Sequence, residues 1–234
     1  MLNSLDKETR NIVSLEDPVE YNIPGINQSQ VRAEIGYTFA AGLRTTLRQD
    51  PDVIMVGEIR DKETAQLAIQ AALTGHLVFS TLHTNSAIGA IPRLIDMGVD
   101  PYLIAPTLIL SVAQRLLKTI SPGAQKPIED EGALAMMVEK DFADLPAQYK
   151  NKINLARPFN DAVPTQESST GMHGRTAVFE VFAVDKEIEK IILSEPTEPR
   201  LWESARKKGM LTMKEDAMLK CMDGVVPFKE VNLL

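Results

Sequence analysis

The sequence predicts an α/β protein built on a mainly parallel sheet. Short apolar segments alternate with amphipathic segments of helical period, and each apolar segment is followed at once by polar residues. Since parallel strands need a crossover connection, which is usually a helix, this alternation favours a parallel sheet over an antiparallel one. Hydrophobic residues make up 44% of the 234 residues, which is enough for a substantial core.

Three strands and four helices are predicted in the first half of the chain. The strands are 11–15 (NIVSL), 52–59 (DVIMVGEI) and 76–83 (HLVFSTLH), and the helices are 38–49, 62–73, 86–97 and 101–117. Asp61 is the expected N-cap of the second helix, and Thr84 or Asn85 that of the third. The fourth helix holds the longest apolar stretch, YLIAPTLILSVA, which is interrupted by Pro106 and shorter than the roughly 20 residues of a membrane span.

The composition changes at Ser121. Two segments rich in Pro, Gly and polar residues flank a modest helix, which predicts an insertion over 121–174. A strand at 175–184 (RTAVFEVFAV) and three short helices follow, which predict a last core strand and a C-terminal helical cap. The expected division is therefore a core at 1–120, the insertion, and a C-terminal part at 175–234.

Charge and cysteine content exclude several classes of function. A formal net charge of -7 offers no general attraction to nucleic acid or to an anionic membrane surface. The single cysteine, Cys221, excludes an internal disulfide framework and a zinc site made only of cysteines, and it fits a reducing interior.

Polar residues stand at the end of each predicted strand of the first half. They are Glu16 with Asp17, Gly57 with Glu58, and His83 with Thr84. In open parallel sheets, ligands bind beyond the carboxyl ends of the strands. A carboxylate after an apolar strand is what a nucleotide hydrolase uses to hold metal-bound water or to polarise the attacking water. The pattern therefore indicates a nucleotide-hydrolysis site.

Each of these residues also has a simpler interpretation. Taken alone, Glu58 is equally consistent with a solvated strand-end residue that pairs with Arg60 or Lys62. A lone His83 is more often a packed, hydrogen-bonded histidine than a catalytic one. The acidic pair after the first strand is consistent with a turn, and Arg44 and Arg48 are consistent with the solvated face of a helix. The coincidence of polar groups at successive strand ends favours the site.

Two long motifs resemble the secretion and pilus-assembly ATPases of type II secretion and type IV pili. They are LEDPVEY and TFAAGLRTTLRQDPDVIMVGEIRDKETAQLAIQAALTGHLVFSTLHTN, and the resemblance extends from about Asn11 to Glu180. It implies a RecA-like P-loop NTPase core that acts as a cytoplasmic homohexamer, peripheral to the inner membrane through platform proteins. It also implies Mg²⁺ as cofactor and ATP hydrolysis coupled to pilin or pseudopilin assembly.

The resemblance implies a role for each candidate residue. LEDPVEY is similar to the family's aspartate box, IMVGE to its atypical Walker B motif, and TGHLVFSTLHTN to its histidine box. The implied catalytic residues are Glu58, Glu16 and His83, with Mg²⁺ held through water at the two carboxylates. The implied nucleotide- or phosphate-binding residues are Arg44, Arg48, Gly57, His76 and Asp17. The two arginines match those that reach phosphate at a subunit boundary, and His76 is expected to support its strand.

Two departures from the family pattern are visible. No segment matches G-x-x-x-x-G-K-[ST], the loop whose backbone N–H groups hold phosphate, so we expect the isolated chain to bind ATP weakly and to be inactive. The resemblance implies that the loop belongs one helix upstream of this sequence, so we expect the chain to be either a truncated fragment or a natural degenerate subunit. ISPGAQK and PTQESSTGMHGR stand where secretion members often carry four zinc-binding cysteines, so no zinc site is expected.

Two other functions remain open at this stage. A non-catalytic interaction subunit would dock into a ring of complete subunits without turning over ATP. A DNA-translocating motor of the same fold is a weaker alternative, because the chain lacks a strongly basic face.

Overall fold

The computed structural model describes residues 2–129, 131–166 and 168–234 and divides into two compact units. The first unit comprises Met1–Thr84, Gly89–Ile109 and Glu189–Thr197, and the second comprises Asn85–Ile88, Leu110–Ile188 and Glu198–Leu234. The predicted division into core, insertion and C-terminal part rests on the change of composition at Ser121, and it stays a prediction.

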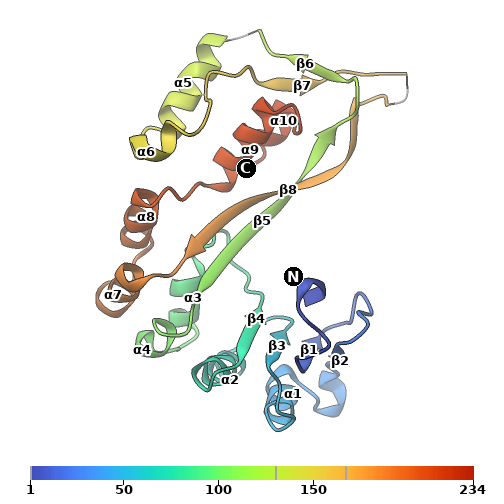
Figure 1. Ribbon diagram of the computed structural model, residues 1–234, viewed down its shortest axis with the longest axis vertical. Coiled ribbons are helices and arrows are strands. Elements are labelled where there is room, and N and C mark those ends of the chain that lie inside the picture. The colour runs from blue at the N-terminus through green and yellow to red at the C-terminus, as the bar shows by residue number, and fades with distance from the viewer. Residues whose placement is uncertain (1, 130, 167) are drawn as a thin grey trace. The chain divides into compact units, whose positions relative to one another are not determined.

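A parallel sheet forms the centre of the first unit (Figure 1). Its strands are β1 (Ile12–Glu16), β2 (Asn27–Gln30), β3 (Val53–Val56) and β4 (Leu77–Ser80), in the order β2-β1-β3-β4. Leu15 pairs with Val56 and Val56 with Ser80, so the carboxyl ends of β1, β3 and β4 are level with one another. The predicted α/β class with a mainly parallel sheet is confirmed.

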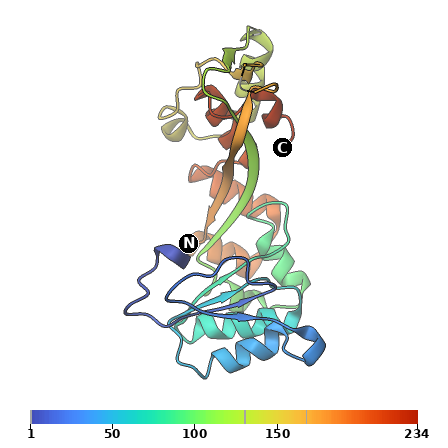
Figure 2. The same cartoon turned by 90° about the vertical axis from the view of Figure 1, so that its right-hand side faces the viewer.

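Two helices cover one face of this sheet. Helix α1 (Phe39–Thr46) contacts β1 and β3, and α2 (Lys62–Leu73) contacts β4; Figure 2 shows the two helices side by side along the sheet. Asp61 is the N-cap of α2, as predicted, because its side chain accepts a hydrogen bond from Thr64 N at 2.8 Å. The apolar residues of β1 and β3 are buried, and five of them have at most 1% exposure: Ile12, Leu15, Val53, Ile54 and Val56.

The helix predicted over 101–117 is wrong. Helix α4 (Pro101–Ile104) is a single turn, and β5 (Leu110–Ile120) is a strand. Pro106 disfavours a continuous helix, and β5 pairs antiparallel with β8 (Met172–Ala183) along nearly its whole length. The period of this apolar run does not by itself distinguish a strand from a buried helix.

The helix predicted over 86–97 is also shorter than expected. Helix α3 spans Ala90–Asp96, its N-cap residue is Gly89, and no side chain caps it from that position. Neither Thr84 nor Asn85 takes the predicted capping position, and the residues between His83 and α3 form bends and a turn.

The second unit combines the β5–β8 ribbon with short strands and helices. Its other elements are β6 (Gln125–Pro127), α5 (Glu131–Asp141), α6 (Ala147–Lys150), β7 (Asn160–Ala162), α8 (Glu198–Lys207), α9 (Met213–Met222) and α10 (Phe228–Val231), and α7 (Lys186–Ser194) begins in it. Strands β6 and β7 pair antiparallel. Within the described ranges, no helix combines the length and apolar character that a bilayer crossing requires.

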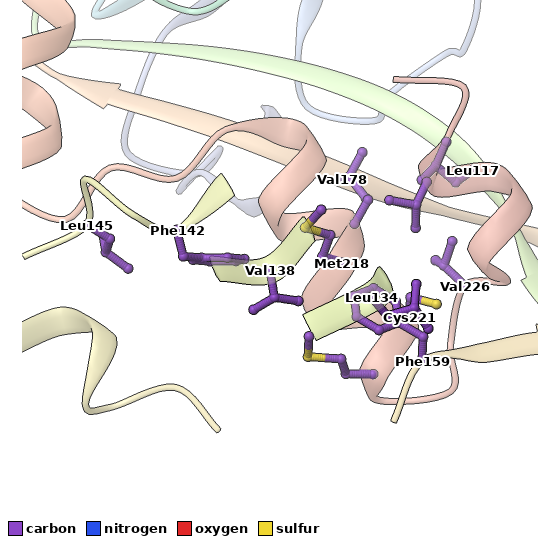
Figure 3. Packing of buried hydrophobic residues seen from close by; sticks show 13 residues of the cluster. Leu117, Leu134, Val138, Phe142, Leu145, Phe159, Val178, Met218, Cys221 and Val226 are labelled. Atoms are coloured by element: carbon purple, nitrogen blue, oxygen red, sulfur yellow. The ribbon is translucent and has the colours of Figure 1, made fainter. Parts of the chain in front are cut away.

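The core of the second unit joins the ribbon to α5 and α9 (Figure 3). Leu117 and Val178 come from the ribbon, Val138 from α5, and Met218 and Cys221 from α9. The Cys221 thiol is fully buried, and this burial raises its pKa to about 12. Because the thiolate is the reactive form, we infer that this thiol is inert in the folded chain.

A buried ion pair fixes the C-terminal helices to each other. Arg206 of α8 donates two hydrogen bonds to the Glu215 carboxylate of α9, at 2.9 and 2.5 Å, and both side chains are at most 4% exposed. Arg206 also pairs with Asp144, and Glu215 completes a capping box with Thr212 at the start of α9. One guanidinium thus joins α8, α9 and the segment that follows α5.

Candidate active site

The structure brings three of the predicted side chains to one edge of the sheet. Glu16 is the last residue of β1, Glu58 follows β3 by two residues, and His83 follows β4 by three. Because the three strands are parallel and their ends are level, the residues that follow them meet at the same edge (Figure 1). The placement expected from the sequence is found, while the chemical roles stay predictions.

Glu58 lies at the centre of this edge. Its side chain is only 13% exposed, and its two oxygens lie 2.9 Å from His83 Nε2 and 2.5 Å from Arg60 Nη2. The hydrogen bond from Arg60 lowers the pKa of the Glu58 carboxyl most, burial opposes this effect, and His83 lowers it further. Glu58 is therefore an ionised acceptor at neutral pH, between two cationic or potentially cationic groups that are largely exposed.

Glu16 is held by two polar side chains that the sequence did not single out. Its Oε1 atom accepts hydrogen bonds from Ser14 Oγ at 2.6 Å and from Gln28 Nε2 at 2.9 Å. Ser14 is buried on β1, and Gln28 comes from β2, the neighbouring strand. These contacts fix the direction of the carboxylate beside the β1–β3 edge.

Gly57 allows a close approach between strands just before Glu58. Its N–H donates to the Leu15 carbonyl at 2.7 Å, and a Cβ atom at this position would lie 2.9 Å from the same oxygen. Thr81 Oγ1 donates to the Gly57 carbonyl at 2.6 Å. The backbone that carries Glu58 is thus fixed from both neighbouring strands, a role of Thr81 that the sequence analysis missed.

Asp17 lies close enough to act on the same charge network. Its negative charge, together with the stronger effect of Glu58, raises the pKa of the Arg60 guanidinium. The pair between Glu58 and Arg60 is the contact that the simpler interpretation of Glu58 expected, and it coexists with the pair to His83.

Three other predicted residues lie elsewhere in the first unit. His76 precedes β4 at its amino end, where its Nδ1 lies 2.8 Å from the Ala71 carbonyl oxygen. Arg44 pairs with Glu63 of α2. Arg48 is exposed and adjoins Gln49, whose carbonyl accepts a hydrogen bond from Asn11, just before β1. The structure therefore places Arg48 and His76 toward the amino ends of the strands, away from Glu58.

The donor set fits a magnesium ion held by few protein ligands. Over the ranges that the structure describes, no three His, Cys, Asp or Glu side chains form a group that could hold a metal. Mg²⁺ is commonly bound by one or two carboxylates, waters and substrate phosphates, rather than by a cage of protein ligands. Glu16 and Glu58 at one edge supply the oxygen chemistry that such a site needs.

The parallel sheet and its polar carboxyl edge define an α/β protein of the P-loop NTPase fold. Similar solved structures support this class: 98% of the chain matches the ATPase DotB of Legionella pneumophila with a TM-score of 0.63, 23% identity and 52% of that chain covered. The pilus retraction motor PilT with bound ADP gives a TM-score of 0.62 and 26% identity, over 98% of this chain and 53% of that one.

Sequence comparisons then give the family. Residues 1–233 match the model of the type II/IV secretion system protein family, and the chain belongs to this family. It is 43% identical to type II secretion system protein E of Pseudomonas aeruginosa, over 98% of this chain and 44% of that protein. It is 42% identical to the type IV pilus assembly ATPase PilB of Thermus thermophilus, over 99% of this chain and 25% of that protein.

The resemblance stated from the two motifs is thus confirmed, and the family is one of secretion and pilus-assembly ATPases. The chain spans less than half the length of these two relatives.

Proposed function

We propose that this chain is the C-terminal ATPase region of a secretion or pilus-assembly motor. The complete motor, meaning this region together with a segment that carries a phosphate-binding loop, would couple Mg-ATP hydrolysis to pilin or pseudopilin assembly. The observation that carries this proposal is the hydrogen-bonded pair of Glu58 and His83 at the carboxyl edge of a parallel sheet, in a chain of this family.

Glu58 is the proposed general base. Its carboxylate is ionised and able to accept a proton from the attacking water, and Glu16 orients water or the metal beside it. Arg60 covers one oxygen of Glu58, and a terminal phosphate would compete for that exposed guanidinium. His83 is 79% exposed and can contact such a phosphate while it holds the other oxygen. Bound Mg²⁺ would supply charge neutralisation on the phosphates, with Glu58 and Glu16 as its water-mediated ligands.

The positions of the arginines support a ring. Arg48 lies toward the amino ends of the strands, and Arg44 is taken up by Glu63. If these arginines contact phosphate, the nucleotide of a neighbouring copy is therefore a better candidate than a nucleotide at the carboxyl edge of the same chain. We propose a homohexamer of the complete motor on the cytoplasmic side of the inner membrane, where platform proteins bind it.

A second candidate rests on the missing phosphate-binding loop. Backbone N–H groups of such a loop supply most of the contacts to the α- and β-phosphates, and this sequence contains no copy of its pattern. The chain by itself would then be a non-catalytic interaction subunit within a ring of complete subunits.

A nucleotide titration of the chain tests both candidates. With Mg-ATP added to ¹⁵N-labelled protein, we expect no saturation below about 1 mM, which corresponds to a binding free energy weaker than about -4.1 kcal/mol. The amide signals that do move should belong to Gly57, Glu58 and His83. Saturation at micromolar Mg-ATP would contradict the reliance on the missing loop. ATP turnover by the complete motor that rises on addition of DNA would favour the DNA-translocating alternative instead.

A further inference from the structure

The side-chain amide of Gln28 links Glu16 to the loop between β1 and β2. Its Nε2 atom donates to Glu16 Oε1 at 2.9 Å and to the Tyr21 carbonyl at 3.0 Å, and its Oε1 atom accepts from Ile23 N at 2.7 Å. Tyr21 and Ile23 belong to this loop, which spans residues 17–26, and all of these residues lie in the first compact unit. One amide thus contacts both a proposed catalytic carboxylate and the backbone of the 17–26 loop.

The partners of the Gln28 amide permit only one orientation of it. A glutamine side chain offers two N–H donors on one side and a carbonyl oxygen on the other. The Tyr21 carbonyl can only accept and the Ile23 N–H can only donate, so the loop requires the orientation in which the NH₂ group also faces Glu16. A rotated amide would place its oxygen against the Glu16 carboxylate, and two acceptors would then face each other.

The strand register places Gln28 on the same face of the sheet as Glu16. In the parallel pairing of β1 with β2, Gln28 is opposite Ser14 and Gln30 is opposite Glu16. Side chains two positions apart in a strand point to the same face, so all four side chains share one face. Gln30 is exposed, while Gln28 is half-buried and reaches Glu16 on the diagonal. The contact therefore depends on this particular amide, and not on being directly opposite the carboxylate.

The 17–26 loop is open to the outside at its tip and enters β2 through a turn. Tyr21 is 79% exposed, and the turn contains Pro24 and Gly25. Gly25 has a φ of 83°, a left-handed conformation that favours glycine. Ile26 N donates to the Ile23 carbonyl at 3.3 Å across this turn. Since Gln28 bonds Ile23 as well, the turn and the amide hold each other in place.

We propose that Gln28 is a positioning residue for Glu16, and that the 17–26 loop sets the direction of the Gln28 amide. A loop that moved Tyr21 and Ile23 away would free the amide to rotate, and Glu16 would lose the donor that Gln28 supplies. Because coupling between two sites is reciprocal, a change at Glu16 must also weaken the contacts of the loop. The effect on turnover rests on the proposed function, but the coupling of Glu16 to the loop does not.

NMR of the chain measures both ends of this coupling, through amide exchange at Ile23 and the ¹³C signal of the Glu16 carboxyl group. Gln28→Met keeps a side chain of similar length but has no amide. In this variant, exchange at Ile23 should rise about tenfold or more, because its acceptor is lost, and the Glu16 signal should move. In Glu16→Ala, exchange at Ile23 should rise about threefold or more, because the carboxylate and the loop share one hydrogen-bond network.

Two further variants separate positioning from a general loss of structure. Gln28→Glu keeps an acceptor for the Ile23 N–H but presents a like charge to Glu16. Exchange at Ile23 should therefore stay below that of Gln28→Met, while the Glu16 signal moves further. Gln30→Met is the matched control on the same strand, and it should change neither reading.

Three results would overturn the proposal. Unchanged exchange at Ile23 in Glu16→Ala would show that the loop and the carboxylate are not coupled. A Glu16 signal that stays in place in Gln28→Met and Gln28→Glu would show that Gln28 does not position it. Equal effects of Gln30→Met and Gln28→Met would assign the changes to the strand rather than to the amide. If Gln28→Met does not fold, Gln28→Glu and Glu16→Ala still decide.

In the complete motor, Gln28→Met should lower kcat about tenfold or more while the KM for ATP changes little, because a misdirected Glu16 affects the reacting groups rather than the binding of nucleotide. Gln30→Met should leave both unchanged. An unchanged kcat in Gln28→Met, together with a Glu16 signal that moves, would contradict the proposed role of Glu16 in the reaction. It would leave the coupling intact, because the NMR comparison decides that independently.

Discussion

Glu58→Gln in the complete motor is expected to lower kcat for ATP hydrolysis by about 10²- to 10⁴-fold, the usual contribution of a general base. Glutamine keeps the shape of the side chain and one acceptor oxygen for Arg60 or His83, but it cannot accept a proton from water. Since the nucleotide would be held mainly by the phosphate-binding loop, the Kd for Mg-ATP should change little. Steady-state turnover and a nucleotide titration of the same preparation give the two numbers.

Glu203→Gln is the matched control, because this exposed carboxylate on α8 pairs with the surface cations Arg200 and Lys207 of its own helix. It should leave kcat unchanged. Hydrolysis by Glu58→Gln at the rate of the unchanged motor would remove Glu58 from the role of base. A large loss of Mg-ATP affinity with unchanged kcat would instead make it a binding residue.

Arg206→Met is expected to lower the free energy of unfolding by about 3–5 kcal/mol, because it leaves the Glu215 carboxylate buried and uncompensated. Glu215 is 3% exposed in its side chain, so water cannot replace the lost partner without opening the contact between α8 and α9. Urea unfolding followed by circular dichroism measures the change. The buried Cys221 thiol is a second probe, since its rate of alkylation should rise as the second unit opens more often.

Lys207→Met is the control at the next position. Lys207 makes an exposed pair with Glu203, so the loss of unfolding free energy should stay below about 0.5 kcal/mol. The double variant Arg206→Met/Glu215→Met removes both charges and should be more stable than Arg206→Met alone. Equal effects of Arg206→Met and Lys207→Met would show that the buried pair contributes no more than a surface one.

Strand ends were the most predictable part of the fold and of the site. The apolar runs of β1 and β3 are each followed by a residue that marks the end of a strand. Pro18 disfavours helix in the residue before it, and Gly57 permits the close approach of the Leu15 carbonyl. With a parallel sheet predicted, level strand ends follow from topology, so Glu58 and His83 were expected near each other. The local sequence therefore carried the information needed for this part of the site.

Contacts between distant segments were not predictable in the same way. Leu110–Ile120 is apolar enough for a buried helix, and only its pairing with β8 makes it a strand. Gln28 acts through a partner 12 positions away, and nothing in its local sequence indicates that partner. Arg60 stands two positions after Glu58, so the sequence indicated it as a possible ion-pair partner of Glu58. Spacing alone could not decide between Arg60 and Lys62.

His76 is a different case. It stands in the same motif as His83, but a strand of four residues separates them, so they lie toward opposite edges of the sheet. Its hydrogen bonds to the end of α2 fit the expected support of the strand, and its placement gives no support to a contact with phosphate at the carboxyl edge.

The central claim is that the carboxyl edge of β1, β3 and β4 faces the terminal phosphate of ATP. A crystal structure of the complete motor with Mg²⁺ and a non-hydrolysable ATP analogue measures this directly. We predict the terminal phosphate within hydrogen-bond distance of the His83 imidazole, with Glu58 reaching the attacking water. A nucleotide bound at the amino ends of these strands, beside His76, would contradict the claim.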